Sequence, residues 1–248
     1  MRMFAGPNGS GKSTLKSYLS PALLGVYLNP DDLEREISRQ GFLNFSAYGV
    51  TTAATDVLKF FTGSAFLKEA GLGDAVEKLQ FADGRLKFEQ VAVNSYFASV
   101  AVEFLRQKLL AQKETFTFET VMSHPGKVEL LAQAQAAGYR TYLYFVATDD
   151  PAINISRVKN RVKLNGHDVP EERIAPRYHR SLDLLMTAIH HTNRAYIFDN
   201  STFNADLKHT WLAEITDGRE LELKTDRIPA WFKRAVLYKI SSSQNPAV

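Results

Sequence analysis

A glycine-rich loop near the start of the chain has the residue types and the spacing to hold phosphate groups. Residues 6–13 match the pattern Gly-x-x-x-x-Gly-Lys-Ser. Gly9 and Gly11 permit backbone conformations in which successive amides point inward around an anion. Lys12 is suited to the β- and γ-phosphates of a nucleotide, and the Ser13 hydroxyl is suited to Mg²⁺. The loop therefore predicts a site for a nucleoside triphosphate with Mg²⁺; the alternative is a flexible Gly/Ser turn. The predicted nucleotide-binding residues of the loop are Pro7, Asn8, Gly9, Ser10, Gly11, Lys12, Ser13 and Thr14.

Acidic residues stand at the ends of two predicted strands. Asp31 and Asp32 follow residues 26–29, and Glu119 lies near the end of residues 116–120. An attacking hydroxyl needs a carboxylate to take its proton, and Mg²⁺ takes oxygen ligands. Asp31 is nearer to its strand, so it is predicted to be the catalytic base, a substrate contact and a metal ligand. Glu119 is predicted to orient the substrate hydroxyl or to help bind the metal. The alternatives are helix capping for the two Asp residues and a structural acid for Glu119.

Arginines on two predicted helices could neutralise phosphate charge. Arg157 and Arg161 are four residues apart, so they share one face of the helix predicted over residues 151–163. The next helix carries three more, Arg173, Arg177 and Arg180. Together the helices predict a lid over about residues 157–180 that closes on the triphosphate and excludes water. Arg157 and Arg161 are the predicted catalytic arginines, and Arg177 is a predicted substrate contact. The alternative is an exposed basic face paired with nearby acids.

Two of the six histidines lie in loops near these groups. His124 follows the strand that carries Glu119 and is predicted to line the substrate pocket, and His167 lies in the predicted lid. The alternative for each is a structural role. The histidines show no arrangement typical of metal ligands.

The order of the predicted elements indicates how these residues are positioned. Apolar runs alternate with helical patterns, which is typical of a parallel sheet with helices on both faces. The predicted strands are residues 1–5, 26–29, 116–120, 139–147 and 196–198. Ligands of such sheets bind at the carboxyl ends of the strands, where the loop and the acids are expected to converge. The fold class predicted is therefore α/β, a P-loop NTPase of the small-molecule kinase type with a five-stranded parallel sheet.

Three segments depart from this alternating pattern. Residues 42–90 are rich in Gly and Phe and are predicted to be a partly helical insertion without a clear core of its own, with a hairpin at Asp83-Gly84. We therefore expect a kinase-like domain over residues 1–202. A β-hairpin appendage is predicted within residues 203–240, and residues 241–248 are predicted to be a disordered tail. A further helix is predicted from residue 170 to about residue 191, with a kink at its proline, residue 176.

The composition is that of an ordinary globular protein. The chain has 248 residues, is 45% hydrophobic and 23% charged, and carries a formal net charge of +3. This excess is too small for a typical nucleic-acid binder. There is no cysteine, which excludes disulfides and thiolate chemistry and favours a reducing, cytoplasmic location. We find no apolar run of the length of a membrane span, and the glycine loop begins too early to leave room for a signal peptide.

The motifs together resemble the zeta-toxin family of P-loop kinases, and more narrowly its chromosomal branch, often labelled predicted ABC-type ATPases. The resemblance covers about residues 1–40 and 90–202. It is carried by Phe4 to Thr14, Leu28 to Leu33, Phe118 to Ser123, Ala137 to Tyr139, Arg157-Val158, Arg161-Val162, Gly166 to Pro170, Arg177 to Leu182 and Asp199 to Ser201.

This resemblance implies a fold, a cofactor and a reaction. Members of the family have a five-stranded parallel kinase core, and its toxins use ATP to phosphorylate the 3′-hydroxyl of UDP-N-acetylglucosamine and are held by a small antitoxin. The resemblance implies that Asp31 is the base and that Lys12 and a lid arginine stabilise the transferring phosphate. It further implies that Glu119 and Thr120 face the substrate and that Asn200 lies at the nucleotide.

The sequence thus predicts an ATP-dependent kinase that acts on a hydroxyl of a small molecule. A second hypothesis is a partner-regulated ATPase or nucleotide switch of a toxin–antitoxin type. The ABC transporter signature Leu-Ser-Gly-Gly-Gln is missing from the sequence. A third hypothesis is a nucleic-acid end kinase, but the sequence has no stripe of basic and aromatic residues to support it.

Overall fold

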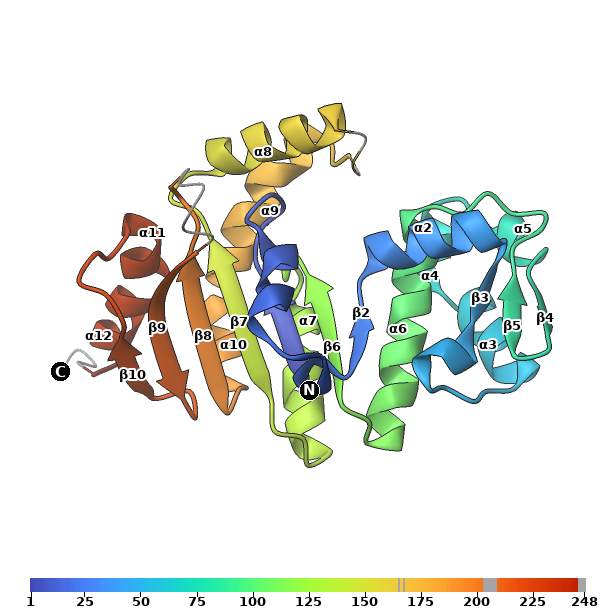
Figure 1. The fold of residues 1–248 in the computed structure, drawn as a ribbon, viewed down its shortest axis with the longest axis horizontal. Helices are drawn as coiled ribbons and strands as arrows, with labels where there is room; N and C mark the ends of the chain where they lie inside the picture. The colour runs from blue at the N-terminus through green and yellow to red at the C-terminus, as the bar shows by residue number, and fades with distance from the viewer. Residues whose placement is uncertain (165, 167, 203–208, 245–248) are drawn as a thin grey trace. The chain divides into compact units, whose positions relative to one another are not determined.

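A computed structural model describes residues 1–164, 166, 168–202 and 209–244. The chain forms two compact units (Figure 1). The first unit contains Met1–Leu23 and Phe118–Val248, and the second contains Leu24–Thr117. The first unit therefore holds the glycine loop and both helices of the predicted lid, while Asp31 belongs to the second.

The first unit is built on a mostly parallel β-sheet, which confirms the predicted α/β class. Its strands follow the hydrogen-bonded order β10-β9-β8-β7-β1-β6, in which β7 pairs in parallel with both β1 and β8. The strands are β1 (Arg2–Ala5), β6 (Phe116–Thr120), β7 (Tyr142–Ala147), β8 (Arg194–Asp199), β9 (Thr210–Thr216) and β10 (Glu220–Leu223). Strand β7 is buried from Leu143 to Ala147, as expected for a strand with both faces covered. In the second unit, Val26 of β2 (Val26–Leu28) donates a hydrogen bond to the carbonyl of Thr115 just before β6.

The predicted C-terminal hairpin forms and extends this sheet. Strand β9 pairs antiparallel with β8, from Arg194 opposite Thr216 to Asp199 opposite Thr210, and β10 pairs antiparallel with β9. The parallel strands thus end in an antiparallel edge, a common arrangement in mixed sheets.

Helices of the first unit follow the strands in chain order. They are η1 (Lys12–Tyr18), α1 (Pro21–Leu24), α7 (Pro125–Ala136), α8 (Pro151–Lys163), α9 (Glu171–Asp183), α10 (Leu185–His190), α11 (Ala230–Phe232), η3 (Lys233–Leu237) and α12 (Tyr238–Gln244). The helix after the glycine loop is a short 3₁₀ helix, η1. It ends at Tyr18, and its C-cap Leu19 is in extended conformation.

Two details of the predicted helices are corrected. The helix predicted from residue 170 to about residue 191 is divided at Leu184, which is the C-cap of α9 and the N-cap of α10. Pro176 lies inside α9. Residues 241–244, predicted to be disordered, continue α12, while residues 245–248 lie outside the described part of the chain.

The second unit has its own small sheet and core. The sheet has the order β3-β5-β4, and the predicted hairpin at Asp83-Gly84 forms with positive φ at both turn residues, as a type I′ turn requires. Its elements are α2 (Pro30–Gln40), β3 (Phe42–Asn44), η2 (Phe45–Tyr48), α3 (Ala54–Thr62), α4 (Ala65–Glu69), α5 (Gly73–Val76), β4 (Gln80–Ala82), β5 (Arg85–Lys87) and α6 (Ser95–Gln112).

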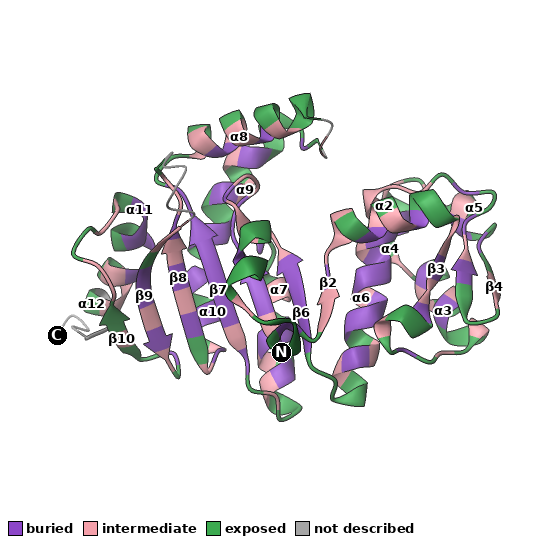
Figure 2. Ribbon diagram, viewed as in Figure 1, coloured by how far each residue is buried: buried purple, intermediate pink, exposed green. Residues whose placement is uncertain are grey.

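Residues 42–90 share a packed interior with the flanking helices α2 and α6. Phe45 and Phe61 are almost fully buried, and Phe45 meets Phe104 of α6 edge to face. Figure 2 shows buried segments along α6. Burial of each such side chain contributes about 1.5–3 kcal/mol. The segment that the sequence analysis left without a clear core is therefore part of a packed unit.

None of the described helices is both long enough and apolar enough to span a membrane.

Candidate active site

The glycine loop follows β1 in the first unit and is curled by three glycines with positive φ. The φ angles are 141° at Gly6, 73° at Gly9 and 98° at Gly11. A Cβ atom on Gly6 would lie 2.0 Å from the carbonyl oxygen of Val146, and one on Gly9 would lie 2.6 Å from that of Asn154. Both conformation and close backbone contact therefore require glycine at these positions.

Gly6→Ala is expected to destabilise the fold by about 3 kcal/mol, because a methyl group there adds a clash with backbone to an unfavourable φ. Gly138→Ala is the matched control, since Gly138 has φ 86° but no atom within 4 Å of the added Cβ. It should cost only about 1 kcal/mol. Urea unfolding followed by circular dichroism measures both values. Equal losses would show that the close packing of the loop against β7 is wrong.

Lys12 and Ser13 lie where the loop enters η1. The Lys12 ammonium group donates hydrogen bonds to the carbonyls of Gly6 and Pro7, each at 2.9 Å. The Ser13 hydroxyl donates to a carboxylate oxygen of Glu119 at 3.3 Å, and Glu119 is only 8% exposed. The structure therefore brings the acid at the end of β6 to the loop.

Two asparagine side chains donate hydrogen bonds to backbone carbonyls of the glycine loop. The amide of Asn200, just after β8, donates to the carbonyl of Ser10 at 2.8 Å. The amide of Asn154, in α8, donates to the carbonyl of Asn8 at 2.6 Å and is fully buried. Asn154 was not among the site residues predicted from the sequence. A polar residue one turn before the buried Val158 on an amphipathic helix was the available signal.

Three rings, those of Tyr18, Phe198 and His209, pack together at η1. The ring of His209 bonds through Nε2 to the Thr14 hydroxyl at 3.1 Å and through Nδ1 to the Tyr18 hydroxyl at 2.7 Å. Tyr18 stacks on Phe198 with ring centroids 5.9 Å apart. These contacts give His209 a structural role beside the glycine loop.

The predicted lid arginines lie on two helices that pack together. Val158 and Ile155 of α8 form a small apolar core with Val169 and with Ile174 of α9. Figure 1 shows α8 lying across the carboxyl end of β7. Asn165 and His167, between the two helices, lie outside the described residues.

Arg157 and Arg161 are partly buried. Burial lowers the pKa of Arg157, and the nearby carboxylate of Asp199 acts in the opposite direction. The Nε and Nη2 atoms of Arg161 are buried, and no described residue supplies them with an acceptor. Gly166 packs against the Arg161 stem, since an added Cβ would lie 2.5 Å from its Cγ. Buried guanidinium atoms of this kind are suited to an anionic ligand.

The arginines of α9 differ in exposure. Arg177 is partly buried, whereas Arg173 and Arg180 are exposed. Arg180 donates to the carbonyl of Ser123 at 3.3 Å, and Ser181 donates to that of Val121 at 2.8 Å. These two bonds anchor α9 to the segment that follows β6.

A buried network joins the C-terminal segment to the base of the lid. The indole N–H of Trp231 donates to Asp199 at 2.8 Å, and the backbone N–H of Trp231 donates to Asp149 at 3.1 Å. Ser201 donates to Asp199 at 2.6 Å. Trp231 is fully buried, so α11 is fixed beside the ends of β7 and β8.

Asp31 lies in the first turn of α2, in the second unit. The side chain of Asn29 caps this helix by accepting from the Asp31 backbone N–H at 2.9 Å. Asp32 forms an ion pair with Arg35. Among the described residues, no ion pair or side-chain hydrogen bond involves the Asp31 carboxylate, which is partly exposed. Of the two acids, Asp31 is therefore the one with an uncommitted carboxylate.

Thr120 and His124 accept hydrogen bonds from backbone N–H groups in the segment after β6. The Thr120 hydroxyl accepts from the Met122 N–H at 3.1 Å, and Met122 has a positive φ of 54°. His124 is the N-cap of α7, where its Nδ1 accepts from the Gly126 N–H at 3.2 Å. Their predicted contacts with substrate stay predictions.

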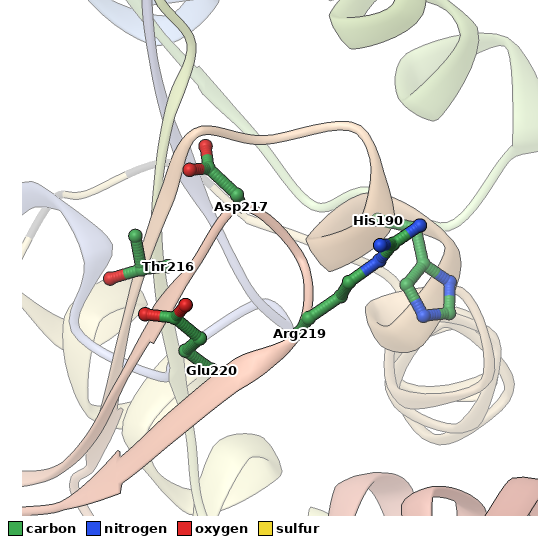
Figure 3. Close-up of a pocket in the computed structure, with 5 residues that line it drawn as sticks. All are labelled: His190, Thr216, Asp217, Arg219 and Glu220. Atoms are coloured by element: carbon green, nitrogen blue, oxygen red, sulfur yellow. The ribbon is translucent and has the colours of Figure 1, made fainter.

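A hollow of about 580 Å³ lies elsewhere in the first unit, at the β9–β10 turn (Figure 3). It is lined by His190, Thr216, Asp217, Arg219 and Glu220. Thr216 pairs with Arg194 at the start of β8, so the hollow lies at the opposite end of the strands from the glycine loop. No group of three or more acids or histidines that could hold a metal occurs in the described part of the chain.

Comparisons with known proteins bear on the fold and the family. No curated protein matches the sequence. A crystal structure of AvrRxo1-ORF1:-ORF2 with ATP matches with a TM-score of 0.53 and 14% identity, over 100% of this chain and 64% of that chain. The AvrRxo1-ORF1:AvrRxo1-ORF2 structure with sulphate ions matches with a TM-score of 0.52 and 15% identity, over 100% and 65%. This chain thus spans slightly less than two thirds of their length, and the likeness shows a shared fold.

A weaker likeness is to the PezAT chromosomal toxin–antitoxin system of Streptococcus pneumoniae, with a TM-score of 0.46 and 15% identity, over 99% of this chain and 86% of that chain. The family model described as Zeta toxin matches residues 87–206, which include Glu119, both helices of the predicted lid and Asn200. Over these residues the chain is similar to the zeta toxin family.

Proposed function

We propose that this protein is an ATP-dependent phosphotransferase that moves the γ-phosphate of Mg·ATP to a hydroxyl of a small molecule. The observation that carries the proposal is that Lys12 contacts the glycine loop while the neighbouring Ser13 is hydrogen-bonded to Glu119. A lysine beside curled backbone amides, with a hydroxyl and an acid next to it, is what a triphosphate and its metal ion require. The AvrRxo1 complex with ATP, which shares the fold, supports ATP as the nucleotide.

The donor set at Ser13 and Glu119 fits Mg²⁺. This ion prefers oxygen ligands, keeps several waters and needs only one or two protein groups beside the phosphates. The Ser13 hydroxyl and the Glu119 carboxylate are within 3.3 Å of each other. When bound, Mg²⁺ would neutralise charge on the β- and γ-phosphate oxygens. Glu119 thus replaces Asp31 as our proposed acidic partner of Ser13 at the metal, while Asp31 keeps the role of base.

The lid arginines would act on the γ-phosphate. Arg161 has buried donors suited to an anion, and Arg157 shares its helix face. Charge developing on the transferring group would be stabilised by these guanidinium groups in a site from which water is excluded. Lys12 would exchange its two carbonyl contacts for phosphate oxygens. The other loop residues would hold the α- and β-phosphates through their backbone amides, while Asn200 would hold the loop itself.

The acceptor hydroxyl would lose its proton to Asp31. This assignment rests on the uncommitted carboxylate of Asp31 and on its place after β2. Similarity to the zeta toxin family over residues 87–206 favours a nucleotide sugar such as UDP-N-acetylglucosamine as the acceptor. Thr120, His124 and Arg177 are proposed contacts of that acceptor.

Glu119→Gln should lower the apparent affinity for Mg²⁺ by about 10- to 100-fold, because the amide cannot supply the negative charge. ATP turnover measured across a Mg²⁺ titration tests this expectation. Glu129→Gln, at an exposed site on α7, is the matched control and should leave the titration unchanged. If both variants titrate as the wild type does, Glu119 has no place at the metal.

A partner-regulated ATPase is the second candidate, because the AvrRxo1 structures contain two proteins, ORF1 and ORF2. An antitoxin-like protein is therefore a proposed partner of this chain. Incubation with ATP labelled at the γ-phosphate and with UDP-N-acetylglucosamine separates the candidates. A labelled sugar nucleotide supports the kinase. Release of free phosphate alone, increased by a partner protein, would support the ATPase instead.

A further inference from the structure

Asn154 joins the lid helix α8 directly to the glycine loop. Its side-chain N–H donates to the carbonyl of Asn8 at 2.6 Å, and its side-chain oxygen accepts from the hydroxyl of Thr148. Its backbone carbonyl also lies against the loop, 2.6 Å from where a Cβ on Gly9 would stand. Both the side chain and the main chain of Asn154 thus contact the loop at residues 8 and 9.

The environment of Asn154 permits one orientation. The residue is 0% exposed, so water cannot replace either of its partners. A buried amide that loses its hydrogen bonds bears the full desolvation penalty. A rotation of α8 about its axis would break the bonds to Asn8 and to Thr148 together. The rotational setting of the helix is therefore coupled to the shape of the loop.

The helix period places the lid arginines on the same side as Asn154. Residues three and seven positions after Asn154 share its face of an α-helix, and these are Arg157 and Arg161. The next face of α8 carries Ile155 and Val158, which pack with Ile174 of α9. One face of α8 is thus held by α9 and the adjacent face by the glycine loop.

We propose that Asn154 is a positioning residue that sets the rotation of α8, so that Arg157 and Arg161 face the γ-phosphate end of the glycine loop. This inference rests on the proposed ATP-binding function. It predicts that Asn154 affects the recognition of the third phosphate more than that of the first two, because under the proposed function the arginines would contact the third.

Asn200 supplies a matched comparison. It also donates a side-chain N–H to the loop, at the carbonyl of Ser10, but it follows β8 and carries no arginine with it. Loss of the Asn200 amide should loosen the loop for every nucleotide alike. Loss of the Asn154 amide should instead reduce discrimination between nucleotides.

Calorimetric titration with Mg²⁺ and either ADP or a non-hydrolysable ATP analogue tests this difference. Asn154→Ala should lower the ratio of ATP-analogue affinity to ADP affinity by about tenfold, because charge-assisted bonds to the γ-phosphate are lost. The affinity for ADP should be nearly unchanged. Asn200→Ala should weaken both nucleotides by the same factor. Equal weakening of both nucleotides by Asn154→Ala would overturn the inference.

Two further variants keep the test decisive. If Asn154→Ala does not fold, Thr148→Val removes the hydroxyl that holds the Asn154 oxygen and also contacts the Asp150 carbonyl at the start of α8, and it should shift the preference in the same direction by a smaller factor. An unchanged preference would contradict the inference.

In an Arg157→Ala, Arg161→Ala background, Asn154→Ala should have no further effect on the preference for the triphosphate. An undiminished effect would contradict the inference, because it would show that Asn154 does not act through these arginines. A folded wild-type protein that binds neither nucleotide would refute the proposed function itself, a result distinct from these.

Discussion

Replacing Asp31 by Asn should lower phosphotransfer by about 10²- to 10⁴-fold, the contribution expected of a general base. The amide keeps the size of the side chain but cannot take the proton of the attacking hydroxyl. Since the Asp31 carboxylate forms no ion pair or hydrogen bond with a described residue, its loss should cost little stability. ATP affinity, measured by calorimetry, should stay within about twofold of the wild-type value.

Asp32→Asn is the control for this variant, because the two acids are neighbours in the first turn of α2. Asp32 is exposed and paired with Arg35, an interaction that contributes at most about 1 kcal/mol. Its replacement should leave turnover almost unchanged. Full activity of Asp31→Asn together with an inactive Asp32→Asn would transfer the role of base to Asp32.

Replacing Lys12 by Met should lower phosphotransfer by about 10²- to 10³-fold and also weaken ATP binding, because the ammonium group contacts the phosphates in both the ground state and the transition state. Met keeps the length and the apolar stem of the side chain. The variant loses the hydrogen bonds to Gly6 and Pro7, so a small fall in melting temperature is expected as well.

Lys16→Met is the control for Lys12. Lys16 lies one turn further along η1 and is exposed. A loss of ATP binding that is the same in both variants would mean that general positive charge, and not the position of Lys12 in the loop, attracts the nucleotide.

The parts of the fold with strong local signals were predicted from the sequence. The helix predicted over residues 151–163 has those bounds in α8, because Asp150 caps it and Pro151 occupies its first turn. The hairpin at Asp83-Gly84 forms because this pair suits a turn with positive φ at both residues. The glycine loop has positive φ at Gly9 and Gly11, the two positions at which the motif predicted backbone conformations that favour glycine.

Features that depend on distant parts of the chain were not predicted. The bond from Asn154 to Asn8 joins residues 146 positions apart, and that from His209 to Thr14 joins residues 195 positions apart. The local pattern around each of these residues is that of an ordinary helix or loop. Trp231 was likewise passed over, since its partner Asp199 is 32 residues away. Only the assembled sheet brings these groups to one end of β1, β7 and β8.

Pro176 is a local signal whose predicted effect, a kink, stays a prediction. The helix α9 runs through Pro176 and ends seven residues later at Asp183. Arg180 and Ser181, beyond the proline, bind the segment after β6. The division of the predicted helix at Leu184 had no comparable local signal, since neither proline nor glycine stands there.

The central claim is that residues 6–13 bind the triphosphate of ATP with Mg²⁺. The most direct measurement is a calorimetric titration of the wild-type protein and of Lys12→Met with Mg·ATP. We predict saturable binding of one nucleotide per chain by the wild type and a large loss of affinity in the variant. Absence of binding by the folded wild-type protein at millimolar Mg·ATP, or equal affinity of the two proteins, would contradict the account.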